Sequence, residues 1–146
     1  MVTGTWSSKS AKEAEKYCKV NRVLPKSDKY IEVPDKSTWS LSANANYLYF
    51  CDNETVHGVE YPELPFNPHN VPLACDMTSD FLTKPVDVSK FGVIVAGTQK
   101  NAGIAGLAIV IVRDDLIKPM SICPSVLDFK VMADNKSLYN TPPCYP

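Results

Sequence analysis

The 146-residue chain has the length of one domain, and its 45% hydrophobic and 21% charged residues are typical of a folded protein. Its net charge of -1 gives no reason to expect nucleic acid or an acidic membrane surface as a partner. Five scattered cysteines without a CxxC motif indicate reduced thiols, as in the cytoplasm. No apolar run is long enough for a signal peptide or a membrane span, so neither is expected.

The first predicted element is a short surface helix. Ser10 and Glu13 have the spacing of a capping box, and residues 11–19 are rich in helix formers, so the helix is expected to start there. Trp6 then lies just before the helix. A proline-punctuated stretch follows, in which residues 30–33 are predicted to form an edge strand or an extended segment.

Four apolar runs then predict the strands of an α/β sheet, and each run stops at a polar cluster. They cover residues 46–51, 71–75, 91–96 and 105–112. The last is the most apolar and predicts a strand buried on both faces. Ligands of such sheets bind beyond the carboxyl ends of the strands. Few covering helices are visible, and the proline-rich stretch after residue 119 reads as loop with one helical turn, which indicates part of a larger fold.

Two charged residues follow these strands directly. Lys100 comes after the 91–96 run and Gly97, where a lysine can be a desolvated amine available for Schiff-base chemistry. The alternative is a solvated loop lysine, which local sequence alone favours. Asp76 follows the 71–75 run and can hold a proton or a cation in an apolar pocket. Its alternative role is an ordinary turn or helix-capping residue.

Other candidates are equally ambiguous when read alone. Trp6 beside a helix start is usually a core residue, and Thr55 after a strand is usually a turn hydroxyl. The loop at residues 137–143 offers amide and hydroxyl donors that suit an anion, or nothing at all. His57 and His69 lack metal-ligand spacing, so no metal site is predicted.

Several motifs taken together resemble the phosphoserine aminotransferases, a family of class-V pyridoxal-phosphate enzymes, and they occur in that family's order. These motifs lie at residues 53–60, 75–79, 85–90, 96–101, 113–116 and 137–143. The resemblance implies that residues 1–146 are a partial large domain of the fold-type I, aspartate aminotransferase-like fold. That domain is α/β, a mainly parallel sheet with covering helices. It also implies that the amino-terminal segment and the carboxyl-terminal small domain are absent.

The resemblance also assigns roles to individual residues. It implies that Lys100 forms a Schiff base with pyridoxal 5'-phosphate and later moves the substrate's α-proton, while Asp76 pairs with the pyridine nitrogen. Trp6 would stack on the cofactor ring, Thr55 would hydrogen-bond the cofactor, and Gln99 would contact its phosphate.

The family's assembly and reaction follow from the same resemblance. Asn140 and Thr141 match a loop that reaches the cofactor phosphate of a neighbouring subunit, which implies a homodimer with a shared active site. The implied reaction moves an amino group from glutamate to 3-phosphohydroxypyruvate, giving phosphoserine and 2-oxoglutarate for serine biosynthesis in the cytoplasm.

Two departures and two alternatives stay open. Thr98 stands where alanine is usual, and Asp80 stands where asparagine is usual, so each can disturb the cofactor region. One alternative is a truncated, catalytically incomplete fragment that acts at most as a cofactor-binding or dimerising module, because the family's substrate-binding arginines lie outside the chain. The other is a different pyridoxal-phosphate enzyme, such as a cysteine desulfurase or a decarboxylase, which shares Lys100 and Asp76 but not the 140–143 loop.

Overall fold

The computed structural model describes residues 1–120 and 122–139. The chain divides into two compact units, Met1–Ile111 and Val112–Pro146, each of which is described by itself. None of the described helices is long and apolar enough to cross a membrane.

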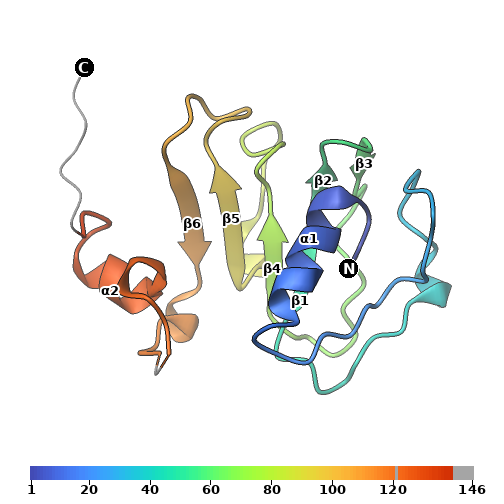
Figure 1. Ribbon diagram of the computed structural model, residues 1–146, viewed down its shortest axis with the longest axis horizontal. Coiled ribbons are helices and arrows are strands. Elements are labelled where there is room, and N and C mark those ends of the chain that lie inside the picture. Colours follow the sequence, from blue (N-terminus) through green and yellow to red (C-terminus); the bar gives the residue numbers. More distant parts are fainter. Residues whose placement is uncertain (121, 140–146) are drawn as a thin grey trace. The chain divides into compact units, whose positions relative to one another are not determined.

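The first unit is built on a four-stranded sheet with the order β1-β4-β5-β6 (Figure 1). The strands β1, β4 and β5 are parallel, whereas the arrow of the edge strand β6 points the opposite way. The expected mainly parallel sheet is therefore present. A separate two-stranded antiparallel ribbon, β2-β3, follows β1. The strand bounds are Leu48–Cys51 (β1), Asn53–Glu54 (β2), Val59–Glu60 (β3), Leu73–Asp76 (β4), Val93–Gly97 (β5) and Ala108–Val112 (β6).

Side chains alternate between the two faces of the sheet, and the core lies on one of them. Phe50, Cys75 and Ile94 are adjacent in register and fully or almost fully buried on this core face. Tyr61 and Phe91 pack on the ring of Phe50, at centroid distances of 5.1 and 6.4 Å. The interstrand register thus aligns the largest apolar side chains in one layer.

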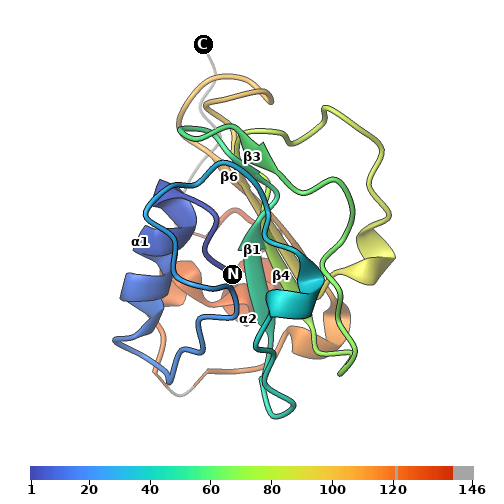
Figure 2. The same ribbon diagram turned by 90° about the vertical axis from the view of Figure 1, so that its right-hand side faces the viewer.

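The helix α1 (Thr5–Ala14) lies on the opposite face, here called the helix face (Figure 2). Its Ser10 hydroxyl is 2.9 Å from the hydroxyl of Tyr49, whose side chain points away from the core. The coverage is incomplete, because Val95 on β5 is 38% exposed. The helix face is therefore covered near β1 and open near β5.

Three sequence-based expectations were wrong in detail. The first helix begins at Thr5 rather than beyond Ser10, because a distant carboxylate caps its start, as described below. Of the two forms expected for residues 30–33, the edge strand is not formed. The segment is a loop with bends at Ile31 and Glu32, and Ile31 is 77% exposed. Residues 108–112 do form a strand, but it is only partly buried, because it lies at the edge of the sheet.

Short 3-10 helices complete the first unit, at Lys36–Thr38 and Val88–Lys90. The second unit contains two more, Asp114–Leu116 and Ser125–Leu127, followed by the six-residue helix α2 (Phe129–Asp134). The carboxylate of Asp128 caps α2 by accepting hydrogen bonds from Lys130 N and Val131 N. This agrees with the predicted loop containing one helical turn.

Candidate active site

Asp76 is the last residue of β4, and its side chain lies on the helix face. Its register partner on β1 is Cys51, whose thiol is 3.5 Å from the Tyr49 hydroxyl on that face. The backbone N–H of Thr78 donates to Oδ1 of Asp76 at 2.9 Å and fixes the half-buried carboxylate. No other described residue donates to this carboxylate, so Oδ2 can accept a hydrogen bond from a ligand.

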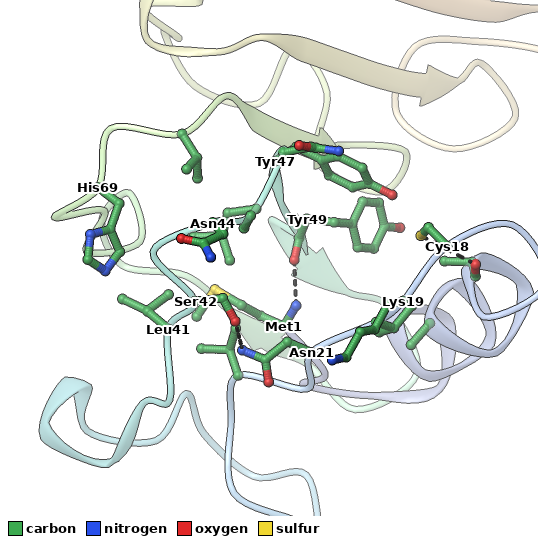
Figure 3. A pocket seen from close by; sticks show the side chains of 18 of the residues that line it. Met1, Cys18, Lys19, Asn21, Leu41, Ser42, Asn44, Tyr47, Tyr49 and His69 are labelled. Atoms are coloured by element: carbon green, nitrogen blue, oxygen red, sulfur yellow. Dashed lines mark hydrogen bonds between the residues drawn. The ribbon is translucent and has the colours of Figure 1, made fainter.

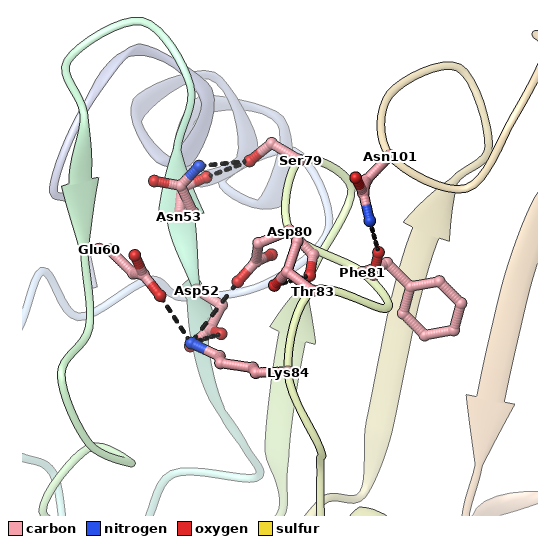
Figure 4. Close-up of polar contacts among 9 residues, drawn as sticks. All are labelled: Asp52, Asn53, Glu60, Ser79, Asp80, Phe81, Thr83, Lys84 and Asn101. Atoms are coloured by element: carbon pink, nitrogen blue, oxygen red, sulfur yellow. Dashed lines mark hydrogen bonds and ion pairs between the residues drawn. The ribbon is translucent and has the colours of Figure 1, made fainter.

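Lys100 lies in the turn that follows β5, and this turn is attached on both sides to the loop after Asp76. Before Lys100, the N–H of Gly97 donates to the hydroxyl of Thr78 at 3.1 Å. After it, the side-chain amide of Asn101 donates to the Phe81 carbonyl at 2.8 Å (Figure 4). These bonds hold the amine-bearing turn beside the strand end that carries Asp76.

The side chains of Lys100 and Gln99 are both exposed. Of the two forms that the sequence left open, a desolvated amine and a solvated loop lysine, Lys100 has the solvated one in this structure. Exposure leaves the amine accessible to a small-molecule carbonyl group, which is what Schiff-base formation requires.

Thr98, the first of the two departures from the family pattern, is buried and directed into its own loop. Its hydroxyl donates to the Ile104 carbonyl at 2.5 Å, and its backbone N–H donates to the Leu107 carbonyl at 3.1 Å. The extra hydroxyl therefore closes the loop that presents Gln99 and Lys100.

Trp6 and Thr55 come from segments far apart in the sequence, and Glu54 connects these two segments. Trp6 is 44% exposed in the first turn of α1, with the amine of Lys9 4.5 Å from its ring centroid. Thr55 is exposed in the turn after β2. The carboxylate of Glu54, immediately before Thr55, accepts the backbone N–H of Trp6 at 3.0 Å.

The turn that carries Thr55 is also tied to the loop after Asp76. The Asn53 side-chain amide donates to the Ser79 hydroxyl, and that hydroxyl donates to the Asn53 carbonyl, both at 2.9 Å (Figure 4). The structure thus gathers five candidates at the carboxyl edge of the parallel strands, namely Trp6, Thr55, Asp76, Gln99 and Lys100. Asn140 and Thr141 lie outside the described residues.

Asp80, the second departure, belongs to a charged cluster on the core side of the sheet (Figure 4). Its carboxylate is 92% buried, as an exposed fraction of 8% indicates, and lies 3.8 Å from the amine of Lys84. Lys84 also contacts Asp52 at 3.0 Å and Glu60 at 2.8 Å. Burial, together with the carboxylate of Asp52, raises the pKa of Asp80 to about 7.

This cluster lies close to Cys75, on the face opposite Asp76. The negative charge of Asp80 is therefore separated by the sheet from the helix face. Sequence reasoning did not foresee Lys84 and Asp52 as its neighbours, because their approach depends on the packing of two loops that no local pattern specifies.

A cavity of about 870 Å³ lies elsewhere in the first unit, along α1 and the amino end of β1 (Figure 3). None of the five candidates lines it, although large pockets are the usual first choice for a ligand site. Its lining includes Tyr47, Tyr49, His69 and Lys19 among apolar, small and amide-bearing residues. The carboxyl edge is the better candidate, because there an amine, a carboxylate and an aromatic ring are held together by hydrogen-bonded loops.

This combination suits a phosphorylated aromatic aldehyde with a basic ring nitrogen. Lys100 supplies an accessible amine, Asp76 supplies an acceptor for a ring N–H, and Trp6 supplies an exposed ring for stacking. Gln99 adds an exposed amide beside Lys100. The residues present therefore fit pyridoxal phosphate.

The fold and this edge define a class of protein, and comparison of the sequence gives the same class. The family model of the class-V aminotransferases matches residues 1–145, and the chain belongs to this family.

Relatives within the family narrow the resemblance. The chain is 58% identical to the phosphoserine aminotransferase of Drosophila melanogaster over 99% of its own length and 40% of the relative's. It is 52% identical to a probable phosphoserine aminotransferase of Caenorhabditis elegans, over 98% of its length and 39% of the relative's. The chain thus spans about two fifths of these relatives, and the predicted resemblance to phosphoserine aminotransferases is confirmed.

Solved structures agree with the sequence comparison. The pyridoxal-phosphate-bound phosphoserine aminotransferase of Trichomonas vaginalis matches with a TM-score of 0.87 and 42% identity, over 97% of this chain and 43% of that one. The enzyme of Bacillus circulans subsp. alkalophilus matches with a TM-score of 0.88 and 38% identity, over 97% and 39%. The predicted α/β fold class is therefore confirmed.

Proposed function

We propose that this chain carries the pyridoxal-phosphate site of a phosphoserine aminotransferase. The observation that carries the proposal is the pair of bonded loops after β4 and β5, which place Asp76 and Lys100 at one sheet edge. The start of α1, where the N–H of Trp6 donates to the carboxylate of Glu54, lies at the same edge. Relatives named as phosphoserine aminotransferases, at 52–58% identity, support this proposal. The reaction we propose is the one that the family resemblance implies, amino transfer from glutamate to 3-phosphohydroxypyruvate.

Pyridoxal phosphate, when bound, supplies an electron sink for a negative charge at the substrate's Cα. In this proposal the carboxylate of Asp76 would hold a proton on the ring nitrogen, which would strengthen that sink. The amine of Lys100 anchors the cofactor and then removes and returns the proton at Cα. Trp6 fixes the plane of the ring, while Gln99 and Thr55 donate hydrogen bonds to its substituents.

The proposal extends to the domain organisation and assembly. Residues 1–146 would form part of the cofactor-binding large domain, and the complete site would form in a homodimer in which Asn140 and Thr141 reach the partner's cofactor phosphate. Light scattering distinguishes a dimer from a monomer. The free thiols of Cys18, Cys51 and Cys75 support a cytoplasmic location, which imaging of a tagged chain tests.

One observation favours a second candidate, a cofactor-binding or dimerising module without transaminase activity. The substrates carry carboxylates and a phosphate, which arginine binds best. Both arginines of the chain instead form ion pairs at the surface, Arg22 with Glu15 at 2.7 Å and Arg113 with Asp115 at 2.5 Å. Such a module would bind cofactor and leave the amino group of glutamate in place.

A stoichiometric half-reaction separates the two candidates. The chain loaded with pyridoxal phosphate is mixed with glutamate, and the 2-oxoglutarate released is measured per chain, before 3-phosphohydroxypyruvate is added and phosphoserine is detected. The transaminase proposal predicts both products in the chain and in the control variant Lys90→Ala, and neither in Lys100→Ala. Cofactor binding without 2-oxoglutarate would identify the module, and equal product from Lys100→Ala would refute a role for that lysine.

A further inference from the structure

Glu54 is a fully buried carboxylate without a basic partner in the described part of the chain. Burying such a charge is costly unless hydrogen bonds replace its hydration. Its Oε1 accepts the N–H of Ser7 at 2.6 Å, and its Oε2 accepts the N–H of Trp6 at 3.0 Å. These N–H groups belong to the first turn of α1 and have no acceptor within the helix. The helix dipole also favours a negative charge at this position.

The start of α1 packs closely against this carboxylate. A Cβ added to Gly4, the residue that precedes α1, would lie 2.5 Å from Cδ of Glu54. The backbone of Gly4 therefore lies directly against the side chain of Glu54, with no space for a side chain between them. A second bridge runs alongside, because the Thr5 hydroxyl is 2.9 Å from Nε2 of His57.

The backbone of Glu54 fixes the other side of the site. Its carbonyl accepts the N–H groups of His57 and Gly58 at 3.2 and 2.8 Å, and so closes the turn that contains Thr55. One residue therefore holds the helix start with its side chain and the Thr55 turn with its backbone.

We infer that Glu54 is a positioning residue, which sets the indole of Trp6 and the hydroxyl of Thr55 relative to each other for binding the cofactor ring. The inference rests on the proposed function for what binds there. The link that Glu54 forms between the start of α1 and the Thr55 turn is here called the Glu54 strut. Its existence rests only on the contacts of Glu54. Glu54 acts through Trp6 and Thr55 rather than by touching the cofactor.

Glu54→Gln is the direct test, because glutamine has the same shape but presents one acceptor and one donor to two N–H groups. The matched control is Glu63→Gln, an exposed acid. Both are made in a Trp39→Phe background, so that Trp6 is the only fluorophore of its kind. Far-UV circular dichroism and denaturant unfolding establish that each variant is folded.

The first measurement is made without cofactor, by quenching Trp6 fluorescence with acrylamide. The strut predicts a higher quenching constant and a shifted emission maximum in Glu54→Gln, with no change in Glu63→Gln. An unchanged Trp6 signal in folded Glu54→Gln would overturn the inference, whether or not the chain binds pyridoxal phosphate.

The second measurement titrates pyridoxal phosphate and follows its visible circular dichroism. We expect the Kd to rise about tenfold in Glu54→Gln, because one charge-assisted hydrogen bond is lost, while borohydride still fixes the cofactor to Lys100. A Kd within twofold of the control would overturn the role in cofactor positioning. Absence of cofactor binding in the parent chain would instead refute the proposed function and leave the fluorescence result to decide on the strut.

A second variant, which leaves Glu54 itself unchanged, covers the case in which Glu54→Gln does not fold. Gly4→Ala pushes the same carboxylate from the helix side and should reproduce the Trp6 shift. Glu54→Asp in the same background keeps the charge, and is expected to restore part of the signal. Gly4→Ala with parental fluorescence and parental Kd would contradict the inference.

Discussion

At the residue scale, the two departures from the family pattern have separate structural consequences. The Thr98 hydroxyl donates a hydrogen bond within its own loop, whereas Asp80 is buried on the core face with Asp52 and Lys84. The Asp80 carboxylate accepts no hydrogen bond from a donor within the described residues, and the amine of Lys84 lies 3.8 Å from it. The ionised form of Asp80 is therefore destabilising on the core face, offset in part by Lys84, and it does not disturb the helix face.

This arrangement predicts how Asp80→Asn changes stability with pH. The pKa of Asp80 is raised from 3.8 to about 7 in the folded chain, so the folded state keeps a proton that the unfolded state releases. Between pH 4 and 7 the wild type should lose stability relative to Asp80→Asn, by at most about 1.4 kcal/mol per pH unit. Urea unfolding at pH 4.5, 6 and 7.5 measures this difference. Asp28→Asn, an exposed acid, is the control, and a difference independent of pH would contradict the assignment.

At the element scale, the sheet could be predicted well and the helix start could not. Each strand is marked locally by an apolar run and a polar stop, as Leu73–Asp76 illustrates. The start of α1 is instead set by Glu54, 47 residues away from Ser7 in the sequence. The capping-box spacing at Ser10 was misleading, because a long-range cap satisfies the helix donors earlier. The burial of β6 was also overestimated, since position within a sheet is not encoded in one strand.

The same distinction applies to the candidate site. The family resemblance implies roles for all five candidates, and four of them, all but Trp6, also follow predicted strands. The structure puts the five at one edge. Glu54 lies within a recognised motif, yet no role was assigned to it, because a glutamate before a turn usually faces solvent. The available sequence signal for this role is Gly4, the residue before α1. A glycine at this position lets the Glu54 carboxylate approach the helix backbone closely.

The loop after β5 supports a prediction about Thr98→Ala. The substitution removes a hydrogen bond to the Ile104 carbonyl and should lower the free energy of unfolding by about 1 kcal/mol. The local effect should be larger, with faster amide exchange at Gly103, whose N–H donates to the Thr98 carbonyl at 2.8 Å. Hydrogen exchange by NMR measures both, with β4 amides as the internal reference. Unchanged exchange at Gly103 would show that the hydroxyl does not hold the loop.

At the scale of the whole molecule, the hydrogen bonds between loops make the carboxyl edge one connected surface. Asn53 bonds Ser79, Thr78 bonds Gly97, and Asn101 bonds the carbonyl of Phe81. The chain spans about two fifths of its relatives and yet contains this connected edge. Cofactor binding is therefore the property that the chain is best equipped to show by itself.

The most direct test is to find where pyridoxal phosphate becomes attached. The chain is incubated with the cofactor, reduced with borohydride, digested and analysed by peptide mass spectrometry, alongside Lys100→Ala and Lys90→Ala. We predict a visible absorption band that reduction abolishes and one phosphopyridoxyl group per chain on Lys100, retained in Lys90→Ala and lost in Lys100→Ala. Label spread over several exposed lysines, or an equal yield in Lys100→Ala, would contradict the assignment of the carboxyl edge as the cofactor site.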